Sequence, residues 1–310
     1  MQPQETALFI GGTGCLGRRL IRRALAKGQR VVNLSRDEHK HWDLDRELGD
    51  VGKGRVEHVI GDAGDAGLVR RTLARVRPAV VYVIHALKHV DRCQLNLHAC
   101  IATNLLSVKC VLDCIEEAAL PGLRAVLFSS TDKAPSPVNA YGMCKALCEE
   151  LMAEKAARVP ATKFVTVRYG NVLNSTASLL PALLRSDAEV YQVTDPRMTR
   201  FWMTIDKACD TVDYALAEGA SGDVVVPKVR SFYVRDLIAH VAALRGRRVE
   251  VVGMRPGERL YETLISDTQS LRAEDRGGYW HVRATAAGAS EPFCYDSNAD
   301  PITDPAAQAA

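Results

Sequence analysis

The chain has 310 residues, of which 47% are hydrophobic and 25% charged, and its 40 basic and 37 acidic residues give a formal net charge of +3. This length suits one large domain or a domain with a smaller lobe, and the balanced charge excludes the basic excess typical of proteins that bind nucleic acid or a membrane surface. No window approaches the roughly 20 apolar residues of a membrane span, and a signal-peptide pattern is missing, so we expect a cytoplasmic protein with small-molecule partners.

A glycine-rich turn opens the pattern of alternating strands and helices. It separates a short apolar run, residues 7–10, from the helical pattern of residues 18–28. Glycines spaced by three allow backbone N–H groups to approach a pyrophosphate at a helix N-terminus. We therefore predict a dinucleotide-binding turn that comprises Gly11, Thr13, Gly14, Cys15, Leu16 and Gly17.

The second expected strand, residues 30–34, ends in polar residues that would face the ribose of a dinucleotide. Ser35 and Arg36 come first, and Asp37 follows. An arginine at this place accommodates the 2′-phosphate of NADP, whereas an acid binds the ribose hydroxyls of NAD. The order favours NADP as the cofactor and leaves NAD open, and a solvated charged turn is the plain alternative.

The third and fourth expected strands, residues 56–60 and 79–85, also end in small or polar residues. Ligands of open α/β sheets bind at the carboxyl ends of the strands. After the third strand, Asp62 and Ala63 would lie at the adenine. After the fourth, Ala86 and Lys88 would contact the cofactor and Lys88 also the substrate, unless they are ordinary loop residues.

A segment rich in polar side chains follows the fifth expected strand, residues 125–130. It contains Thr131, Asp132, Lys133, Tyr141 and Lys145. Residues four apart share one face of a helix, and an ammonium beside a phenol lowers the pKa of the phenol, which can then accept a proton. The Tyr-x-x-x-Lys spacing also occurs by chance on solvated helices, so the surrounding pattern has to decide. Before this strand, a long helix over residues 93–119 contains Asn104, which either faces water or helps to hold Lys145.

The regular alternation ends after residue 172. Up to the sixth strand, residues 163–168, it predicts an α/β fold with a Rossmann-type doubly wound parallel sheet. We therefore expect an NADP-binding domain over residues 1–172, a mainly substrate-binding lobe over 173–283 and a poorly ordered tail over 284–310. Nine scattered cysteines without a C-x-x-C pair, and histidines without ligand spacing, predict reduced thiols and no metal site.

Six motifs occur in order along the chain: GGTGCLG, STDKAPSPVNAYGMCK, RYGNV, TDPRMTRFW, VPK and RPGERLYE. Together they resemble the extended short-chain dehydrogenases of the polysaccharide-biosynthesis type, from about residue 7 to residue 265. More narrowly, they are similar to the inverting UDP-N-acetylglucosamine 4,6-dehydratases, which depend on NADP. Two segments depart from that pattern, because bulkier residues replace small ones at 83–90, and an arginine and a glycine are lost at 174–178.

The resemblance implies a role for each polar residue. Tyr141 would be the redox base, Lys145 would lower its pKa and bind the nicotinamide ribose, and Thr131 would hydrogen-bond the sugar near O4. Lys133, its pKa lowered by cationic surroundings, would remove the C5 proton, while Asp132 assists departure of the C6 hydroxyl. The residues implied to bind the UDP part are Asn171, Arg200, Arg255 and Glu258.

The resemblance thus implies conversion of UDP-N-acetylglucosamine to a UDP-6-deoxy-4-keto sugar. Inversion at C5 is implied because retaining sugar dehydratases carry Asp-Glu where this chain has Asp132 and Lys133. A C4 or C5 epimerase would use the same Tyr141 and Lys145, and a non-catalytic NADP-binding regulator is a third reading. We expect a UDP-sugar as partner, no nucleic acid or membrane, and a homo-oligomer formed by the helices that flank the sheet.

Overall fold

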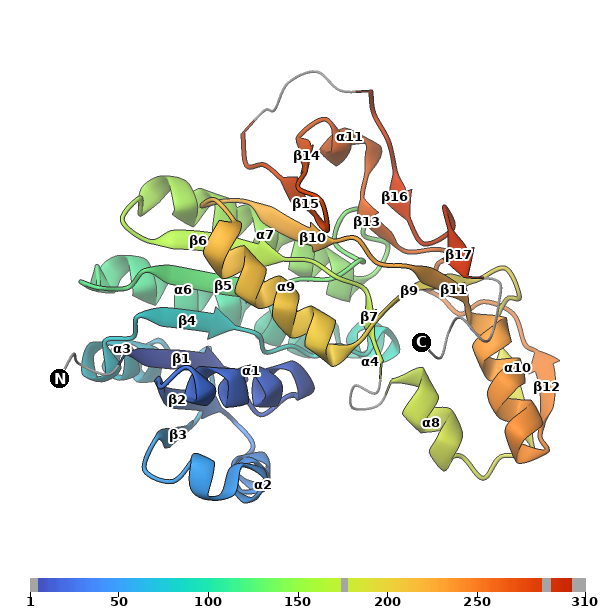
Figure 1. Cartoon of the computed structure of the whole chain (residues 1–310), viewed down its shortest axis with the longest axis horizontal. Coiled ribbons are helices and arrows are strands. Elements are labelled where there is room, and N and C mark those ends of the chain that lie inside the picture. The colour runs from blue at the N-terminus through green and yellow to red at the C-terminus, as the bar shows by residue number, and fades with distance from the viewer. Residues whose placement is uncertain (1–4, 174–177, 286–290, 303–310) are drawn as a thin grey trace.

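A nine-stranded sheet is the centre of the computed structural model, which describes residues 5–173, 178–285 and 291–302 (Figure 1). The strand order is β14-β15-β10-β6-β5-β4-β1-β2-β3. Its strands are β1 (Thr6–Ile10), β2 (Arg30–Ser35), β3 (Val56–Ile60), β4 (Val80–Val83), β5 (Ala125–Ser129), β6 (Lys163–Val167), β10 (Val224–Pro227), β14 (Ala273–Asp275) and β15 (Tyr279–Val282). The seven strands from β3 to β10 are parallel, which confirms the predicted doubly wound fold.

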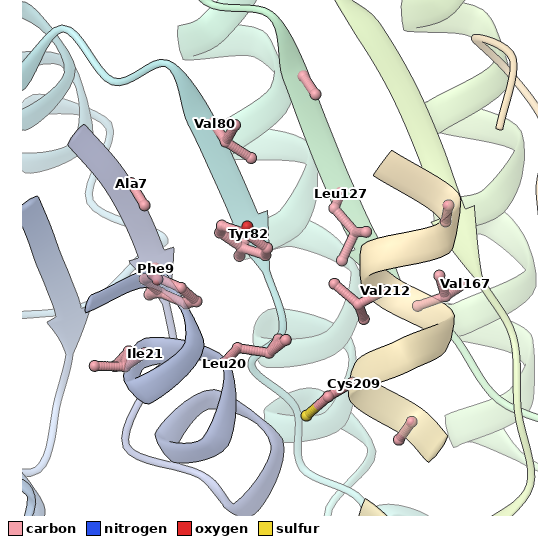
Figure 2. Packing of buried hydrophobic residues seen from close by; sticks show 14 of the residues in the cluster. Ala7, Phe9, Leu20, Ile21, Val80, Tyr82, Leu127, Val167, Cys209 and Val212 are labelled. Carbon is pink, nitrogen blue, oxygen red and sulfur yellow. The ribbon is translucent and has the colours of Figure 1, made fainter. Parts of the chain in front are cut away.

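Helices cover both faces of this sheet because each buries an apolar stripe (Figure 1). One face carries α1 (Cys15–Ala26), α2 (Glu38–Leu48) and α9 (Ile205–Glu218), and the other carries α3 (Ala66–Val76), α6 (Ser107–Ala118) and α7 (Ala140–Arg158). Figure 2 shows Leu20 of α1 and Val212 of α9 in one buried cluster with Tyr82 of β4 and Leu127 of β5. Full burial of such a side chain contributes about 1.5–3 kcal/mol.

Charged side chains join α9 to α1 along the surface. The Arg23 guanidinium lies 2.7 Å from Asp210 Oδ1 and 2.9 Å from Asp213 Oδ2, and Arg19 pairs with Asp206 at 3.0 Å. Because α9 covers the sheet and β10, β14 and β15 extend it, the sheet does not end at residue 172 as the sequence analysis expected.

The expected helix over residues 93–119 is interrupted. It consists of α4 (Val90–Leu95), α5 (Leu97–Ile101), one π-helical turn (Ala102–Leu106) and α6. Asn104 lies in that turn and is fully buried, and its amide accepts from Leu87 N–H at 2.8 Å and donates to Leu87 C=O at 2.9 Å. It therefore holds the loop after β4, which is neither of the roles expected for it.

The stretch Leu97–Ala118 is long and apolar enough, by length and composition, to cross a membrane, which the sequence analysis did not find. In the structure Val108, Val111 and Ile115 of this stretch are buried in the core between the sheet and its covering helices. These apolar side chains of the stretch thus cover the sheet, whereas Leu97 and Leu106 are exposed.

The remaining elements form a smaller lobe beside the large sheet (Figure 1). A four-stranded sheet and two strand pairs are built from β7 (Asn171–Val172), β8 (Val190–Val193), β9 (Thr199–Met203), β11 (Ser231–Tyr233), β12 (Arg248–Val251), β13 (Thr263–Ile265), β16 (Tyr295–Asp296) and β17 (Pro301–Ile302). The helices are α8 (Leu179–Arg185), α10 (Val234–Arg245) and α11 (Asp267–Ser270). Strands β16 and β17 fall within the expected tail, so residues 291–302 differ from that expectation, and 286–290 and 303–310 lie outside the described residues.

A buried ion pair connects the sheet, α7 and the lobe. Arg168, which directly follows β6, is fully buried, and its Nε lies 2.9 Å from Glu149 Oε1 of α7. Its Nη1 also donates to Leu264 O of β13 at 2.7 Å and to Gln269 Oε1 of α11 at 2.9 Å. One guanidinium thus fixes three elements relative to one another.

Replacing this guanidinium is expected to destabilise the whole protein. In Arg168→Met the Glu149 carboxylate keeps its burial and loses its charged partner, so the free energy of unfolding should fall by about 3–5 kcal/mol. Urea unfolding measures this change. Arg70→Met, which removes a half-exposed pair with Glu117, is the control and should cost under about 1 kcal/mol; equal losses in both variants would contradict the assignment.

Candidate active site

A cavity of about 680 Å³ opens at the carboxyl ends of the parallel strands. Its wall is formed by the loops after β1 to β6 and by the start of α7. The structure brings together on this wall every residue expected to bind the cofactor: Gly11, Thr13, Gly14, Cys15, Leu16, Gly17, Ser35, Arg36, Asp62, Ala63, Ala86, Lys88, Tyr141 and Lys145. Thr131, Asp132 and Lys133 lie on it as well.

The glycine turn after β1 has a shape that side chains would destroy. Gly11 has φ +91°, and a Cβ there would lie 2.6 Å from His85 Cβ. A Cβ at Gly17 would lie 2.4 Å from Gly12 O. No side chain caps α1 at Gly14, and its first turn contains no acid, so its N–H groups are available to an anion. This cradle fits the pyrophosphate of a dinucleotide.

The residues after β2 and β3 have distinct partners. Asp37 caps α2 by accepting from Lys40 N–H at 3.2 Å, and Lys40 lowers the pKa of its carboxyl. Arg36 is half-exposed on the cavity wall and lies 3.3 Å from Asp62 Oδ2. The acid is thus engaged by the helix, while a guanidinium stands at the rim of the cavity.

The three residues after β5 form a compact polar group with a fourth that the sequence analysis missed. Thr131 Oγ1 and Lys133 Nζ both donate to Asp132 Oδ1, at 3.1 and 2.9 Å. Lys133 Nζ also lies 3.0 Å from Oε1 of the buried Glu262. Glu262 is the last residue of the RPGERLYE motif, so the motif pointed to this segment. The sequence alone did not reveal which residue of the motif contacts Lys133.

The expected direction of the Lys133 pKa shift is wrong. Burial lowers the pKa of Lys133, but the carboxylates of Asp132 and Glu262 outweigh it, and the pKa is raised above its ordinary value. Burial raises the pKa of Asp132, Lys133 opposes this shift, and the charge of Glu262 adds to it. Burial thus raises the pKa of Asp132, whereas the two neighbouring acids raise that of Lys133, which rests as an ammonium.

The pKa of Tyr141 is not lowered, as was expected from Lys145. Burial raises the pKa of Tyr141 to about 12, with Lys133 and a hydrogen bond with Thr131 acting against this. Lys145 instead donates to Ser129 O at 2.8 Å and lies 4.4 Å above the Phe128 ring. Burial lowers the pKa of Lys145 to about 8.

The role expected for the residues that would bind the UDP part stays a prediction. Asn171 lies on the cavity wall, but Arg200, Arg255 and Glu258 do not. Glu258 accepts from Arg255 N–H at 2.8 Å within one turn. Arg200 donates to the carbonyls of Thr199 and Arg259, at 2.7 and 3.0 Å.

Of the two departing segments, only the first can be placed in full. In residues 83–90, the imidazole of His85 bonds Ser107 Oγ at 2.6 Å, and burial lowers its pKa to about 4. The His85 side chain, which lies against Gly11, is therefore neutral. Residues 174–177 lie outside the described residues.

The burial of Lys145 predicts a pH-dependent stability. Its pKa is about 8 in the folded protein against an ordinary 10.5, so between these values the folded chain binds fewer protons than the unfolded chain. Burial of the charged lysine therefore lowers the free energy of unfolding at about pH 8 and below, and this cost disappears as the pH rises from 8 to 10.5.

We accordingly compare the free energy of unfolding of Lys145→Met with that of the unmodified protein. The value for the variant minus the value for the unmodified protein should be more positive at about pH 7 than at about pH 10. Urea unfolding at both pH values gives the comparison. Lys53→Met, which replaces an exposed lysine, is the matched control. Its difference in free energy of unfolding from the unmodified protein should be the same at both pH values. The same agreement for Lys145→Met would rule out the lowered pKa.

Residues 7–284 match the family described as polysaccharide biosynthesis protein. The chain is 33% identical over 289 residues to the UDP-N-acetylglucosamine 4,6-dehydratase (inverting) of Campylobacter jejuni, covering 90% of this chain and 83% of that one. It is 32% identical over 294 residues to the UDP-glucose 4-epimerase of Rickettsia bellii, covering 90% and 82%.

Solved structures show the same fold. Pen from Bacillus thuringiensis has a TM-score of 0.89 at 25% identity and covers 98% of this chain and 96% of its own. The dTDP-glucose 4,6-dehydratase of Streptomyces venezuelae, solved with NAD and TYD bound, has a TM-score of 0.70 at 23% identity and covers 82% and 86%. The second likeness concerns the fold alone.

Proposed function

This chain belongs to the polysaccharide biosynthesis protein family, and we propose that it is an inverting 4,6-dehydratase that acts on UDP-N-acetylglucosamine. The observation that carries the proposal is the second acid–base group on the cavity wall. Lys133 Nζ lies 2.9 Å from Asp132 Oδ1, beside the Thr131 hydroxyl and the Tyr141 phenol. An oxidation at C4 needs only a base at that carbon, whereas the removal of water needs a further base and a further acid.

The wall of the cavity suits a nicotinamide dinucleotide, which supplies hydride acceptance at C4 and hydride return at C6 when bound. The glycine turn and the first turn of α1 would hold its pyrophosphate. Lys145 would hold the nicotinamide ribose. The structure of the Streptomyces venezuelae relative contains NAD, which supports this class of cofactor.

NADP is the form that the polar residues after β2 favour. Asp37, the acid that would select the ribose hydroxyls of NAD, is occupied as the cap of α2. Arg36 is half-exposed at the cavity rim, with Ser35 beside it. A guanidinium in this place provides the donors that a 2′-phosphate accepts.

Tyr141 and Thr131 would act at C4. The phenol takes the proton of the C4 hydroxyl, while the Thr131 hydroxyl positions that oxygen. Because burial holds the pKa of Tyr141 at about 12, the nearby Lys133 ammonium is the charge that favours the phenolate. The base for oxidation and the base for elimination are thus electrostatically connected.

Lys133 and Asp132 would carry out the elimination. The C4 ketone acidifies the hydrogen on C5, and Lys133 removes this proton as a free amine. Asp132, whose pKa burial raises, would give a proton to the C6 hydroxyl, which leaves as water. Each positioned proton-transfer group contributes roughly 10²–10⁴-fold in rate.

A UDP-sugar epimerase is the second candidate, because the Rickettsia bellii relative is named UDP-glucose 4-epimerase at nearly the same identity. Tyr141 would serve it equally, but a C4 epimerase removes neither water nor the C5 proton, so Asp132 and Lys133 would have no reaction to perform in it. A non-catalytic NADP-binding regulator would need none of the three, so their joint presence on the wall weighs against that reading.

A homo-oligomer is also part of the proposal. The helices α4 to α7 expose large apolar side chains: Leu95, Leu97, Leu106, Met143 and Leu147. Exposed apolar groups gathered on neighbouring helices are typical of an interface. Analytical ultracentrifugation tests this part independently of the reaction.

The dehydratase is tested by incubation with UDP-N-acetylglucosamine in deuterated water, followed by mass and NMR analysis. We expect a product that has lost water and carries deuterium at C5. An isomer of unchanged mass apart from exchange would establish the epimerase instead. If no UDP or dTDP hexose is converted although NADP binds, both enzyme readings fail.

Arg36→Ala tests the cofactor preference. Loss of the guanidinium should weaken NADP binding by roughly 10- to 100-fold and change NAD binding by less than about 3-fold, because only NADP carries the 2′-phosphate. Titration calorimetry measures both affinities. Arg46→Ala, which alters an exposed guanidinium packed on Trp42, should change neither. Equal weakening of both cofactors by Arg36→Ala would contradict the preference.

A further inference from the structure

A carboxylate from the second half of the chain faces Lys133 without reaching the cavity. Glu262 Oε1 lies 3.0 Å from Lys133 Nζ and 3.6 Å from Arg200 Nε, and the Glu262 side chain is only 4% exposed. Lys133 lines the cavity, whereas Glu262 does not. Any effect of Glu262 on a bound substrate therefore passes through groups on the wall, namely Lys133, which it contacts, and Asp132, whose pKa its charge raises.

The backbone of Glu262 is fixed by the C-terminal segment. Its N–H donates to Ser297 Oγ at 3.0 Å, and its C=O accepts from Ser297 N–H at 2.9 Å. Ser297 is fully buried and its hydroxyl lies 2.8 Å from Thr199 Oγ1 of β9. These bonds hold the carboxylate at a set distance from Lys133 Nζ.

One oxygen of this carboxylate has no donor. Glu262 Oε2 is buried and accepts no hydrogen bond from the described part of the chain. A buried carboxylate oxygen without a donor is unfavourable in its charged form, and protonation of the side chain relieves that cost. Lys133, Arg200 and Arg259 outweigh the effect of burial and lower the pKa of Glu262, so a protonated Glu262 is a transient species.

The proposed elimination requires the free amine of Lys133, yet the resting side chain is an ammonium. The charged and titratable groups that face it are Asp132, Glu262, Arg200 and Tyr141. Its proton has to pass to an acceptor in contact with Nζ, and Asp132 and Glu262 are the carboxylates within 3.0 Å. Because Asp132 is needed as the acid at C6, Glu262 is left as the acceptor.

We propose that Glu262 is a positioning residue that accepts the proton of Lys133, a role that rests on the proposed dehydratase function. The proton moves from Nζ to Oε1, leaving a neutral amine and a neutral carboxylic acid. Nζ then binds the C5 proton, the C–H electron pair forms the C5–C6 double bond, and the C6–O bond breaks as Asp132 protonates the departing hydroxyl. Lys133 ends as an ammonium and Asp132 as a carboxylate, so charge and atoms balance.

Glu262→Gln removes the acceptor and keeps the size of the side chain. The protein with NADP and UDP-N-acetylglucosamine is followed through one turnover in deuterated water. Absorbance of the reduced nicotinamide reports oxidation at C4, and deuterium in the product reports exchange at C5. We expect oxidation within about 3-fold of the unmodified protein and exchange slowed roughly 100-fold. Glu250→Gln, on the exposed strand β12, is the matched control and should change neither.

The pH dependence separates this role from a structural one. In Glu262→Gln, Lys133 loses one of the two carboxylates that raise its pKa, so the free amine forms at lower pH than before. The ratio of C5 exchange to C4 oxidation should therefore rise from about pH 6 to about pH 9 in the variant and stay level in the unmodified protein. Glu262→Asp keeps an acceptor, should give a reduced but level ratio, and serves if Glu262→Gln does not fold.

Three results would overturn the role of Glu262. They are a Glu262→Gln ratio equal to that of the unmodified protein at every pH, a loss of C4 oxidation in that variant, and a Glu262→Asp ratio that rises with pH. Failure of the proposed function is distinguishable, because it appears in the unmodified protein as the absence of a dehydrated product, whereas failure of this inference appears only in the variants.

Discussion

The site depends on one ammonium that is held between the buried acidic side chains of Asp132 and Glu262. Moving a charge out of water costs several kcal/mol per ion, so Lys133 can stay charged in this position only with Asp132 and Glu262 beside it. The backbone around these residues is packed too closely to admit further side chains. A Cβ at Gly170 would lie 2.8 Å from Asp132 Oδ2, and one at Gly142 would lie 2.3 Å from Lys133 O. The end of β6 and the start of α7 thus enclose the segment that carries the charges.

The contact between Lys133 and Glu262 requires the lobe to keep a fixed position relative to the large sheet. Asp132 and Lys133 follow a strand of the large sheet, whereas Glu262 belongs to the lobe, so their separation depends on how the two parts are connected. The buried Arg168 connects β6 to β13 and α11, close in the chain to Glu262. A family with many activities can keep this frame and vary the groups on the cavity wall.

Sequence reasoning succeeded where the signal is local. Apolar runs and glycine spacing predicted the parallel strands, and the residues at their carboxyl ends do meet on one cavity wall. It failed where a contact joins distant segments. The pKa of Lys133 could not be given the right direction without Glu262, and the pKa of Tyr141 is set by burial that no spacing reveals. Arg200 was expected at the substrate phosphates; its contacts with the carbonyls of Thr199 and Arg259 join segments that are distant in the chain, and its expected role stays a prediction.

The central claim is that the Lys133 and Asp132 pair works on C5 and C6 of a sugar whose C4 faces Tyr141. A crystal structure of the protein with NADP and a bound UDP-hexose tests it most directly. We predict the C4 hydroxyl at Tyr141, the C5 hydrogen directed at Lys133 Nζ and the C6 hydroxyl at Asp132. A hexose bound with C5 and C6 turned away from both residues, and only C4 at Tyr141, would contradict the account.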